Sequence, residues 1–189
     1  TNYFRRSGPG WIASDATISI PFPDGKVLWL FGDTYLDDYH AADTSIPCLF
    51  HVRNSMLVQD QANRNRFITI LDSTQTGVDR TPVKAGLNDS TVFWPGHGFV
   101  KGDTAYVFWF RYHGKSLEHL GNYYTKILWR DLTNANGIVS LNKLPDMDGR
   151  EFGNAVIAGE ELEFVYIYGR GGHGKLYVAR FPRNYIFSK

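Results

Sequence analysis

Short runs in which apolar and polar residues alternate recur along the whole chain, and each run is bounded by Gly, Pro, Asn or Asp. Alternation with a period of two is typical of strands, and turn-forming residues between two such runs indicate antiparallel hairpins. Segments with the period of an amphipathic helix are scarce. The pattern therefore predicts an all-β protein.

The runs fall into three groups of similar layout. The first group, within about residues 10–72, predicts a four-stranded unit with a Pro-Asp-Gly turn after its first strand and a loop at 35–50. Its expected strands are 16–22, 26–31, 54–59 and 67–71. A second unit within about 88–142 has expected strands at 91–100, 104–110, 126–130 and 138–141. A third within about 150–189 has expected strands at 154–158, 162–168 and 175–181, and lacks the outermost strand.

Units of this kind, repeated at loose spacing, indicate stacked modules. Four-stranded antiparallel sheets arranged radially are the blades of a β-propeller, so we interpret residues 1–189 as a single partial propeller domain of about three blades. Three blades cannot close a ring. The remaining blades would come from further sequence or from another chain. A β-sandwich, which also uses many short strands, is the alternative fold.

Composition narrows the partners. The chain has 20 Lys and Arg against 19 Asp and Glu, so no field of one sign exists to attract nucleic acid or an anionic membrane. No apolar run approaches the ~18 residues of a membrane span. The one cysteine, Cys48, excludes an internal disulfide. These features favour a neutral or locally charged partner such as a polysaccharide or oligosaccharide.

Candidate chemistry follows from hairpin geometry, because the start of the first strand and the end of the second lie at the same edge of a sheet. Asp15 and Asp33 flank the first hairpin in this way, Asp89 precedes the second, and Glu151 precedes the third. We expect these four acids to share one edge. Two carboxyl groups separated by ~5 to 10 Å can cleave a glycosidic bond, one as proton donor and one as nucleophile or base. For each acid taken alone, a turn-forming role is the alternative.

Other polar and aromatic residues fall near the same edge. Expected substrate-binding residues are Trp11, Arg53, Asn54, Trp94, Arg111, His113 and Arg170. Trp11 and Trp94 lie near strand ends and are the expected platforms for sugar rings, whereas Trp29, Trp109 and Trp129 lie inside strands and are expected to pack between blades. No His or Cys spacing typical of a metal site is present, so we expect neither metal nor cofactor.

The segments Gly10–Ser19, Leu28–Thr34 and Val52–Ser55 resemble a bacterial propeller family that was long described as a domain of unknown function and is linked to endo-D-arabinanases. The later segments Tyr166–Gly169 and Tyr177–Pro182 are similar to its repeated blade strand. The resemblance implies a five-bladed propeller that cleaves arabinofuranose polymers and is secreted or periplasmic in a bacterium.

The chain also resembles, more distantly, arabinanase and β-xylosidase propellers, which take one acid from each of the first three blades. That comparison implies Asp15 as base or nucleophile, Asp89 as a modulator of pKa and Glu151 as general acid. The closer resemblance makes Asp33 of the Gly-Asp-Thr motif an equally strong candidate. The leading hypothesis is a glycoside hydrolase with a carboxylate pair drawn from these acids. A non-catalytic carbohydrate-binding or scaffold propeller is the alternative.

Overall fold

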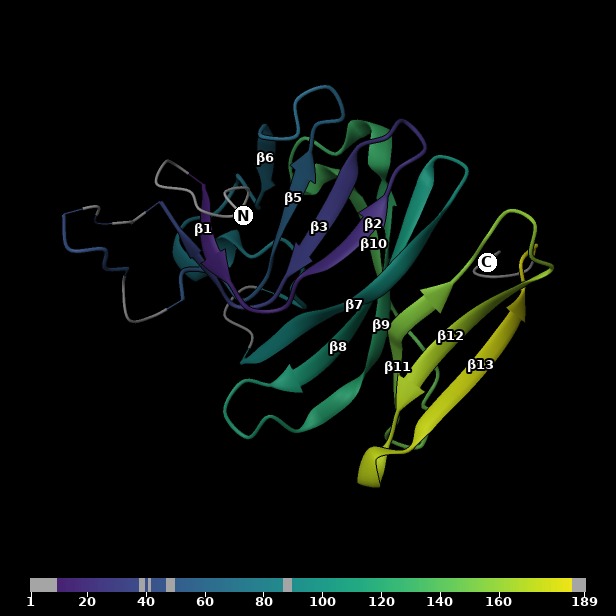
Figure 1. Cartoon of the computed structure of the whole chain (residues 1–189). Coiled ribbons are helices and arrows are strands. Elements are labelled where there is room, and N and C mark those ends of the chain that lie inside the picture. The colour runs from purple at the N-terminus through teal and green to yellow at the C-terminus, as the bar shows by residue number, and fades with distance from the viewer. Residues whose placement is uncertain (1–9, 38–39, 41, 47–49, 87–89, 185–189) are drawn as a thin grey trace.

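The computed structural model describes residues 10–37, 40, 42–46, 50–86 and 90–184. It is an all-β protein built largely from antiparallel sheets (Figure 1). The first large sheet has the order β2-β3-β5-β6 and comprises β2 (Ile18–Pro21), β3 (Val27–Phe31), β5 (Ser55–Gln59) and β6 (Phe67–Ile70). Each strand pairs antiparallel with its neighbour, as the sequence predicts.

The second and third sheets repeat this layout. The second, in the order β10-β9-β8-β7, comprises β7 (Thr91–Lys101), β8 (Thr104–His113), β9 (His119–Leu128) and β10 (Ile138–Lys143). The third has three strands, β11 (Glu151–Ile157), β12 (Phe164–Arg170) and β13 (Leu176–Pro182). The predicted alternation thus identifies all eleven strands of the large sheets, although β9 begins earlier than expected.

The structure also differs from the sequence-based prediction at the start of β11 and in one small sheet. Glu151 is the first residue of β11 and pairs with Arg170, rather than preceding the strand. A small sheet that the sequence analysis missed pairs β1 (Trp11–Ser14) with β4 (Thr34–Leu36), inside part of the expected loop. This pairing forms because Trp11 and Leu36 become buried against Phe31 and Leu57 on one face of the first sheet.

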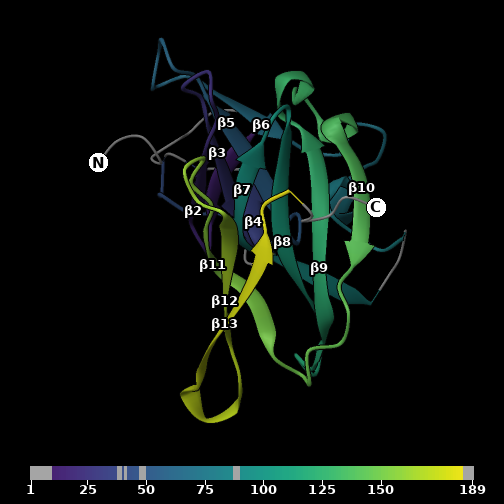
Figure 2. The ribbon, with the colours of Figure 1, turned by 90° about the vertical axis from the view of Figure 1, so that its right-hand side faces the viewer.

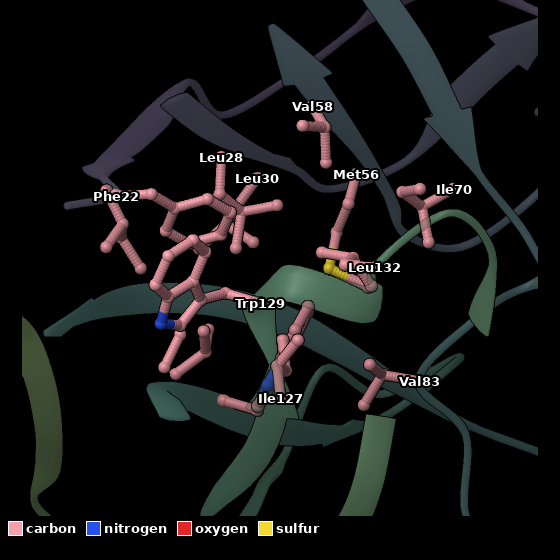
Figure 3. Close-up of a cluster of buried hydrophobic side chains, with 14 of the residues drawn as sticks. Phe22, Leu28, Leu30, Met56, Val58, Ile70, Val83, Ile127, Trp129 and Leu132 are labelled. Atoms are coloured by element: carbon pink, nitrogen blue, oxygen red, sulfur yellow. The ribbon is translucent and has the colours of Figure 1, made fainter. Parts of the chain in front are cut away.

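The main core lies between the first and second sheets (Figure 3). Leu28 and Leu30 of β3 meet Trp109 of β8 and Trp129 there, and the Phe22 and Trp129 ring centroids are 5.4 Å apart. Trp109 and Trp129 therefore pack between sheets as expected. The prediction for Trp29 is wrong. It lies with the cluster under β1 and β4, and its indole N–H donates to Gln59 Oε1 at 3.1 Å.

The first strands of successive sheets are neighbours, since β2 packs beside β7 and β7 beside β11. Glycines allow this approach. A Cβ on Gly96 of β7 would lie 2.5 Å from the Gly153 carbonyl oxygen of β11, and one on Gly98 would lie 2.6 Å from Ile20 Cδ1 of β2. The arrowheads of β3, β8 and β12 point toward the lower side of Figure 1. The hairpin ends that carry the candidate acids therefore lie toward one side of the molecule.

The third sheet has one packed and one open face. Val165 and Ile167 are buried against the second sheet. On the other face Ile157, Leu176 and Val178 are 50%, 73% and 58% exposed. The strand β13 of this sheet lies toward the viewer in Figure 2. Within the described ranges the helices are short 3₁₀ turns, η1 (Gly77–Arg80), η2 (Trp129–Asp131), η3 (Ala135–Gly137) and η4 (Gly172–Gly174), and none could cross a membrane.

Candidate active site

Asp15 and Asp33 lie together at the open end of the β2–β3 hairpin. The Gly32 N–H donates to the Asp15 carbonyl oxygen at 3.1 Å, and the Asp15 N–H donates to the Asp33 carbonyl oxygen at 3.3 Å. Ala16 follows with φ of 51°, a conformation that non-glycine residues adopt at a cost of order 1 kcal/mol or more. The hairpin thus brings together two acids that stand 18 positions apart.

The two carboxyl groups differ in exposure but both have a raised pKa. Asp33 is buried, and burial raises its pKa. The positive charge of Arg53 lowers this pKa, the neighbouring Asp15 charge raises it further, and the Trp94 indole lowers it. Asp15 is more exposed; partial burial raises its pKa, and the backbone of Asp33 and the Arg53 charge offset only part of the effect. Arg53 Nε lies 3.3 Å from Asp33 Oδ1. The Asp15 charge thus acts on the Asp33 carboxyl, so the two acids are electrostatic neighbours.

Gly32 makes room for this arrangement. A Cβ at Gly32 would lie 2.2 Å from Asp15 Oδ1 and 3.5 Å from Trp94 Cδ1. The Asp15 carboxyl therefore lies directly over a backbone position that has no side chain, with the edge of the Trp94 ring beside it. Trp94 is only half-buried, so it is the one of the two predicted sugar platforms that keeps a position at the acids.

Three hydrogen-bonded hydroxyl groups lie beside the backbone that carries Asp33. Thr34 Oγ1 lies 3.0 Å from Ser14 Oγ and 2.8 Å from Ser55 Oγ. The Ser14 hydroxyl donates to the Asp33 carbonyl oxygen at 2.8 Å, and the Thr34 hydroxyl donates to the Gly32 carbonyl oxygen at 2.7 Å. These bonds tie β1, β4 and β5 to the segment that carries Asp33. The bonds therefore hold the backbone from which the Asp33 side chain extends.

Glu151 belongs to a second cluster at the same side. Its carboxylate accepts hydrogen bonds from the Tyr112 hydroxyl at 2.6 Å and from Arg170 Nε. Burial raises the pKa of Glu151, but the bonds from Arg170 and Tyr112 outweigh it and lower the pKa overall. The ring centroids of Tyr112 and Trp94 are 5.0 Å apart, which connects this cluster to the aspartates. A lowered pKa does not suit the general-acid role that the distant resemblance implies for Glu151.

Two expected substrate-binding residues are instead part of the core. Asn54 is fully buried; its Nδ2 donates to the carbonyl oxygens of Val83 and Phe93 at 2.8 and 2.9 Å, and its Oδ1 accepts from the Val83 N–H at 3.2 Å. Trp11 is 4% exposed and its ring packs on Phe31 with centroids 4.8 Å apart. Neither side chain offers a surface to a ligand, so both predictions are wrong.

The remaining predicted residues are not part of the aspartate pair. Arg111 donates to Thr91 Oγ1 at 3.0 Å and to the Tyr123 hydroxyl at 3.3 Å. His113 Nδ1 accepts from backbone N–H groups of its own turn. Asp89 lies outside the described residues. In the part of the chain that the structure covers, no group of three or more His, Cys, Asp or Glu side chains could hold a metal ion.

Sequence reasoning did not assign roles to Tyr112 and Gly32. Tyr112 alternates with Arg111 along β8, so the period of two could have placed it on the face toward the third sheet, beside Glu151. Gly32 stands between the apolar strand and Asp33, and a glycine at this position indicates that another group approaches the backbone closely. The identity of the atom that fills that space could come only from the structure.

Among solved structures, the chain is similar to a crystal structure from Bacteroides ovatus ATCC 8483 whose name is "putative hydrolase". The two are 20% identical with a TM-score of 0.76, and the match covers 97% of this chain and 52% of the other. The chain thus spans about half the length of that protein and shares its fold. No curated protein matches the chain. The model of one family matches residues 1–189 in full, and the chain belongs to that family, described as a domain of unknown function, DUF5005.

Proposed function

We propose that the protein hydrolyses glycosidic bonds of a polysaccharide with the Asp15–Asp33 pair. The observation that carries the proposal is the pair itself, two electrostatically coupled carboxyls of raised pKa at one sheet edge. Groups perturbed in this way are enriched at catalytic sites. The hydrolase name of the structural neighbour supports a hydrolytic reaction, and the sequence resemblance to arabinanases makes arabinofuranose polymers the first substrate to test.

The environment acts on the two acids in opposing ways. Burial and the Asp15 charge raise the pKa of Asp33, whereas Arg53, with Nε 3.3 Å from Asp33 Oδ1, favours the negative charge on that carboxyl. In the proposed reaction one carboxyl of the pair donates a proton to the leaving oxygen as the bond to the anomeric carbon breaks. The other, as the carboxylate, attacks the anomeric carbon or takes a proton from the attacking water. The Trp94 ring lies beside the pair and offers a surface for a sugar ring.

Product analysis after incubation with arabinans and other polysaccharides tests the reaction. Asp15→Asn and Asp33→Asn should each lower the rate by orders of magnitude while circular dichroism stays unchanged. Asp24→Asn is the matched control, because Asp24 lies in the turn at the opposite end of the same hairpin, paired with Lys26. Full activity in both site variants would eliminate the pair. Sugar binding without turnover in the unmodified protein would favour the non-catalytic alternative.

We also propose that the sheets are about three blades of a propeller, for which the sequence resemblance suggests the five-bladed type. Its first strands β2, β7 and β11 are successive neighbours, and the face of the third sheet that carries Leu176 and Val178 is open. We propose that a further blade, from the longer protein or another chain, covers that face. A crystal structure of the longer protein tests this, and a solvent-exposed face there would contradict it.

A polysaccharide substrate also implies a secreted or periplasmic location, which cell fractionation can check.

A further inference from the structure

A second polar site lies beside the aspartates, at the start of β11 and the end of β12. The Glu151 carboxylate is held from two sides, by the Tyr112 hydroxyl and by the Arg170 guanidinium. The Glu151 side chain is 13% exposed and the Arg170 side chain 65% exposed, so the pair reaches from the sheet edge into solvent. The geometry fixes one acceptor group and one donor group next to each other.

This cluster is not built to transfer protons near neutral pH. The pKa of Glu151 is lowered, whereas burial and the Glu151 charge raise the pKa of Tyr112. The carboxylate therefore stays ionised and the phenol stays protonated. The positive Arg170 balances the Glu151 charge, so the cluster is close to neutral as a whole. Such a site suits binding rather than acid–base catalysis.

A pocket of about 330 Å³ opens onto the cluster. Its lining is Gly149, Glu151, Arg170, Gly171, Gly172 and Gly174. A Cβ added at Gly149, Gly172 or Gly174 would meet nothing within 4 Å, so these glycines leave open space and accessible backbone groups around the ion pair. A volume of this size matches the lower end of small-molecule sites.

We propose that this pocket binds a neutral sugar unit of the same polymer that the Asp15–Asp33 pair cleaves, at a distance from the cleaved bond; this rests on the proposed function. Adjacent hydroxyls of a sugar are both donors and acceptors. One hydroxyl donates to Glu151 and its neighbour accepts from Arg170, which matches the fixed order of the two groups. A charged ligand would be attracted by one member of the ion pair and repelled by the other, so its charge would bring little net attraction.

The rings of Trp94 and Tyr112 join the two sites. Trp94 lies against the Asp15 side and its ring centroid is 5.0 Å from that of Tyr112, whose hydroxyl reaches Glu151. Tyr112 is 7% exposed, so the partly exposed Trp94 ring is the aromatic surface that a ligand occupying both sites would contact. The arrangement selects an oligosaccharide over a single sugar, and it favours cleavage within a chain.

Binding can be measured separately from turnover. Arabinofuranose and xylose oligosaccharides, from disaccharides upward, are titrated into the full-length protein carrying Asp15→Asn, with isothermal calorimetry as readout. We expect affinity to rise with chain length for one of the two series. Adding Arg170→Ala should weaken binding of the longest member by about tenfold, the usual effect of losing a hydrogen bond to a charged group, and leave the disaccharide nearly unaffected.

Arg180→Ala is the matched control. Arg180 is exposed on the same sheet, but it lies over the Phe164 ring at the other end, with Cζ 4.7 Å from the ring centroid. The proposed subsite would be overturned if the two Arg variants lost affinity equally or if neither lost affinity. It would also be overturned if no oligosaccharide bound. Arg170-dependent binding without hydrolysis by the unmodified protein would refute only the proposed reaction. Asp-dependent hydrolysis that Arg170→Ala leaves unchanged on long substrates would refute only the subsite.

Discussion

Replacing Asn54 with alanine should destabilise the protein rather than impair sugar binding directly. Asn54 directly precedes the strand β5 and makes three hydrogen bonds with backbone groups, two with Val83 and one with Phe93 of β7. All three bonds are buried, and no solvent can replace the amide once it is removed. The Asn54→Ala variant would leave one N–H donor and two carbonyl acceptors without their partner.

The expected cost follows from these bonds. A buried hydrogen bond contributes about 0.5–1.5 kcal/mol net, so three bonds give a central value of about 3 kcal/mol. With a urea slope of about 2 kcal/mol per M, the midpoint of unfolding should fall by about 1.5 M at an unchanged slope. Asn54→Asp should cost at least as much, because it places a negative carboxylate against two carbonyl oxygens.

Urea unfolding followed by tryptophan fluorescence measures this shift. Asn136→Ala provides the control, since Asn136 is exposed and only its backbone N–H is bonded, to the Asn134 side chain. A midpoint for Asn54→Ala within about 0.2 M of the unmodified protein, less than the loss of one weak bond would cause, would refute the structural role. Sugar affinity lost at unchanged stability would restore the ligand-binding role that the sequence predicts.

Three further predictions concern the two polar sites. Asp33→Asn should abolish hydrolysis without lowering the melting temperature at neutral pH. The folded pKa of Asp33 is raised above 3.8, so the charge of Asp33 lowers the stability of the protein once the pH passes the folded pKa. Calorimetry at neutral and acidic pH should therefore show that the stability of the unmodified protein rises relative to that of the variant as the pH falls through that range. Gly32→Ala should displace the Asp15 carboxyl, because the new Cβ would lie 2.2 Å from Asp15 Oδ1. The rate of product formation should drop at least tenfold in a folded protein, and an unchanged rate would contradict the close approach. Tyr112→Phe should raise the pKa of Glu151 toward 4.5, because the hydrogen bond from the Tyr112 hydroxyl helps to lower it. A carboxyl whose folded pKa is lowered stabilises the protein at pH values above its unfolded pKa, so the loss of stability should be largest above pH 4.5 and shrink in acid. A loss that is independent of pH in urea unfolding would argue against the bond.

The local parts of the fold could be predicted from the sequence. The hairpins are predictable because alternation and turn residues act over a few positions, as in the Pro23–Gly25 turn. The neighbourhood of Asp15 and Asp33 follows from the same hairpin. The pairing of β1 with β4 could not be predicted, because β4 has three residues and depends on burying Trp11, which lies far from it in sequence.

The candidate site is harder to predict, because a polar residue at a strand end can serve either the core or the surface. Asn54 and Arg53 are adjacent and alternate in direction. Arg53 faces Asp33 at 3.3 Å, whereas Asn54 points into the interface of two sheets. One register step decides between the two outcomes, and the sequence does not show which face the second sheet covers.

The aspartates themselves separate structural from functional roles through the sign of their pKa shifts. Asp24, Asp43, Asp60 and Asp72 have a lowered pKa because turn backbone or nearby side chains donate to their carboxylates, which stabilises the fold. Among the described aspartates with a resolved shift, Asp15 and Asp33 are the ones whose pKa is raised. A fold gains nothing from burying an acid whose charge it disfavours. An acid that must hold a proton for a reaction needs that environment, so the raised pKa values favour a catalytic over a turn-forming role for this pair.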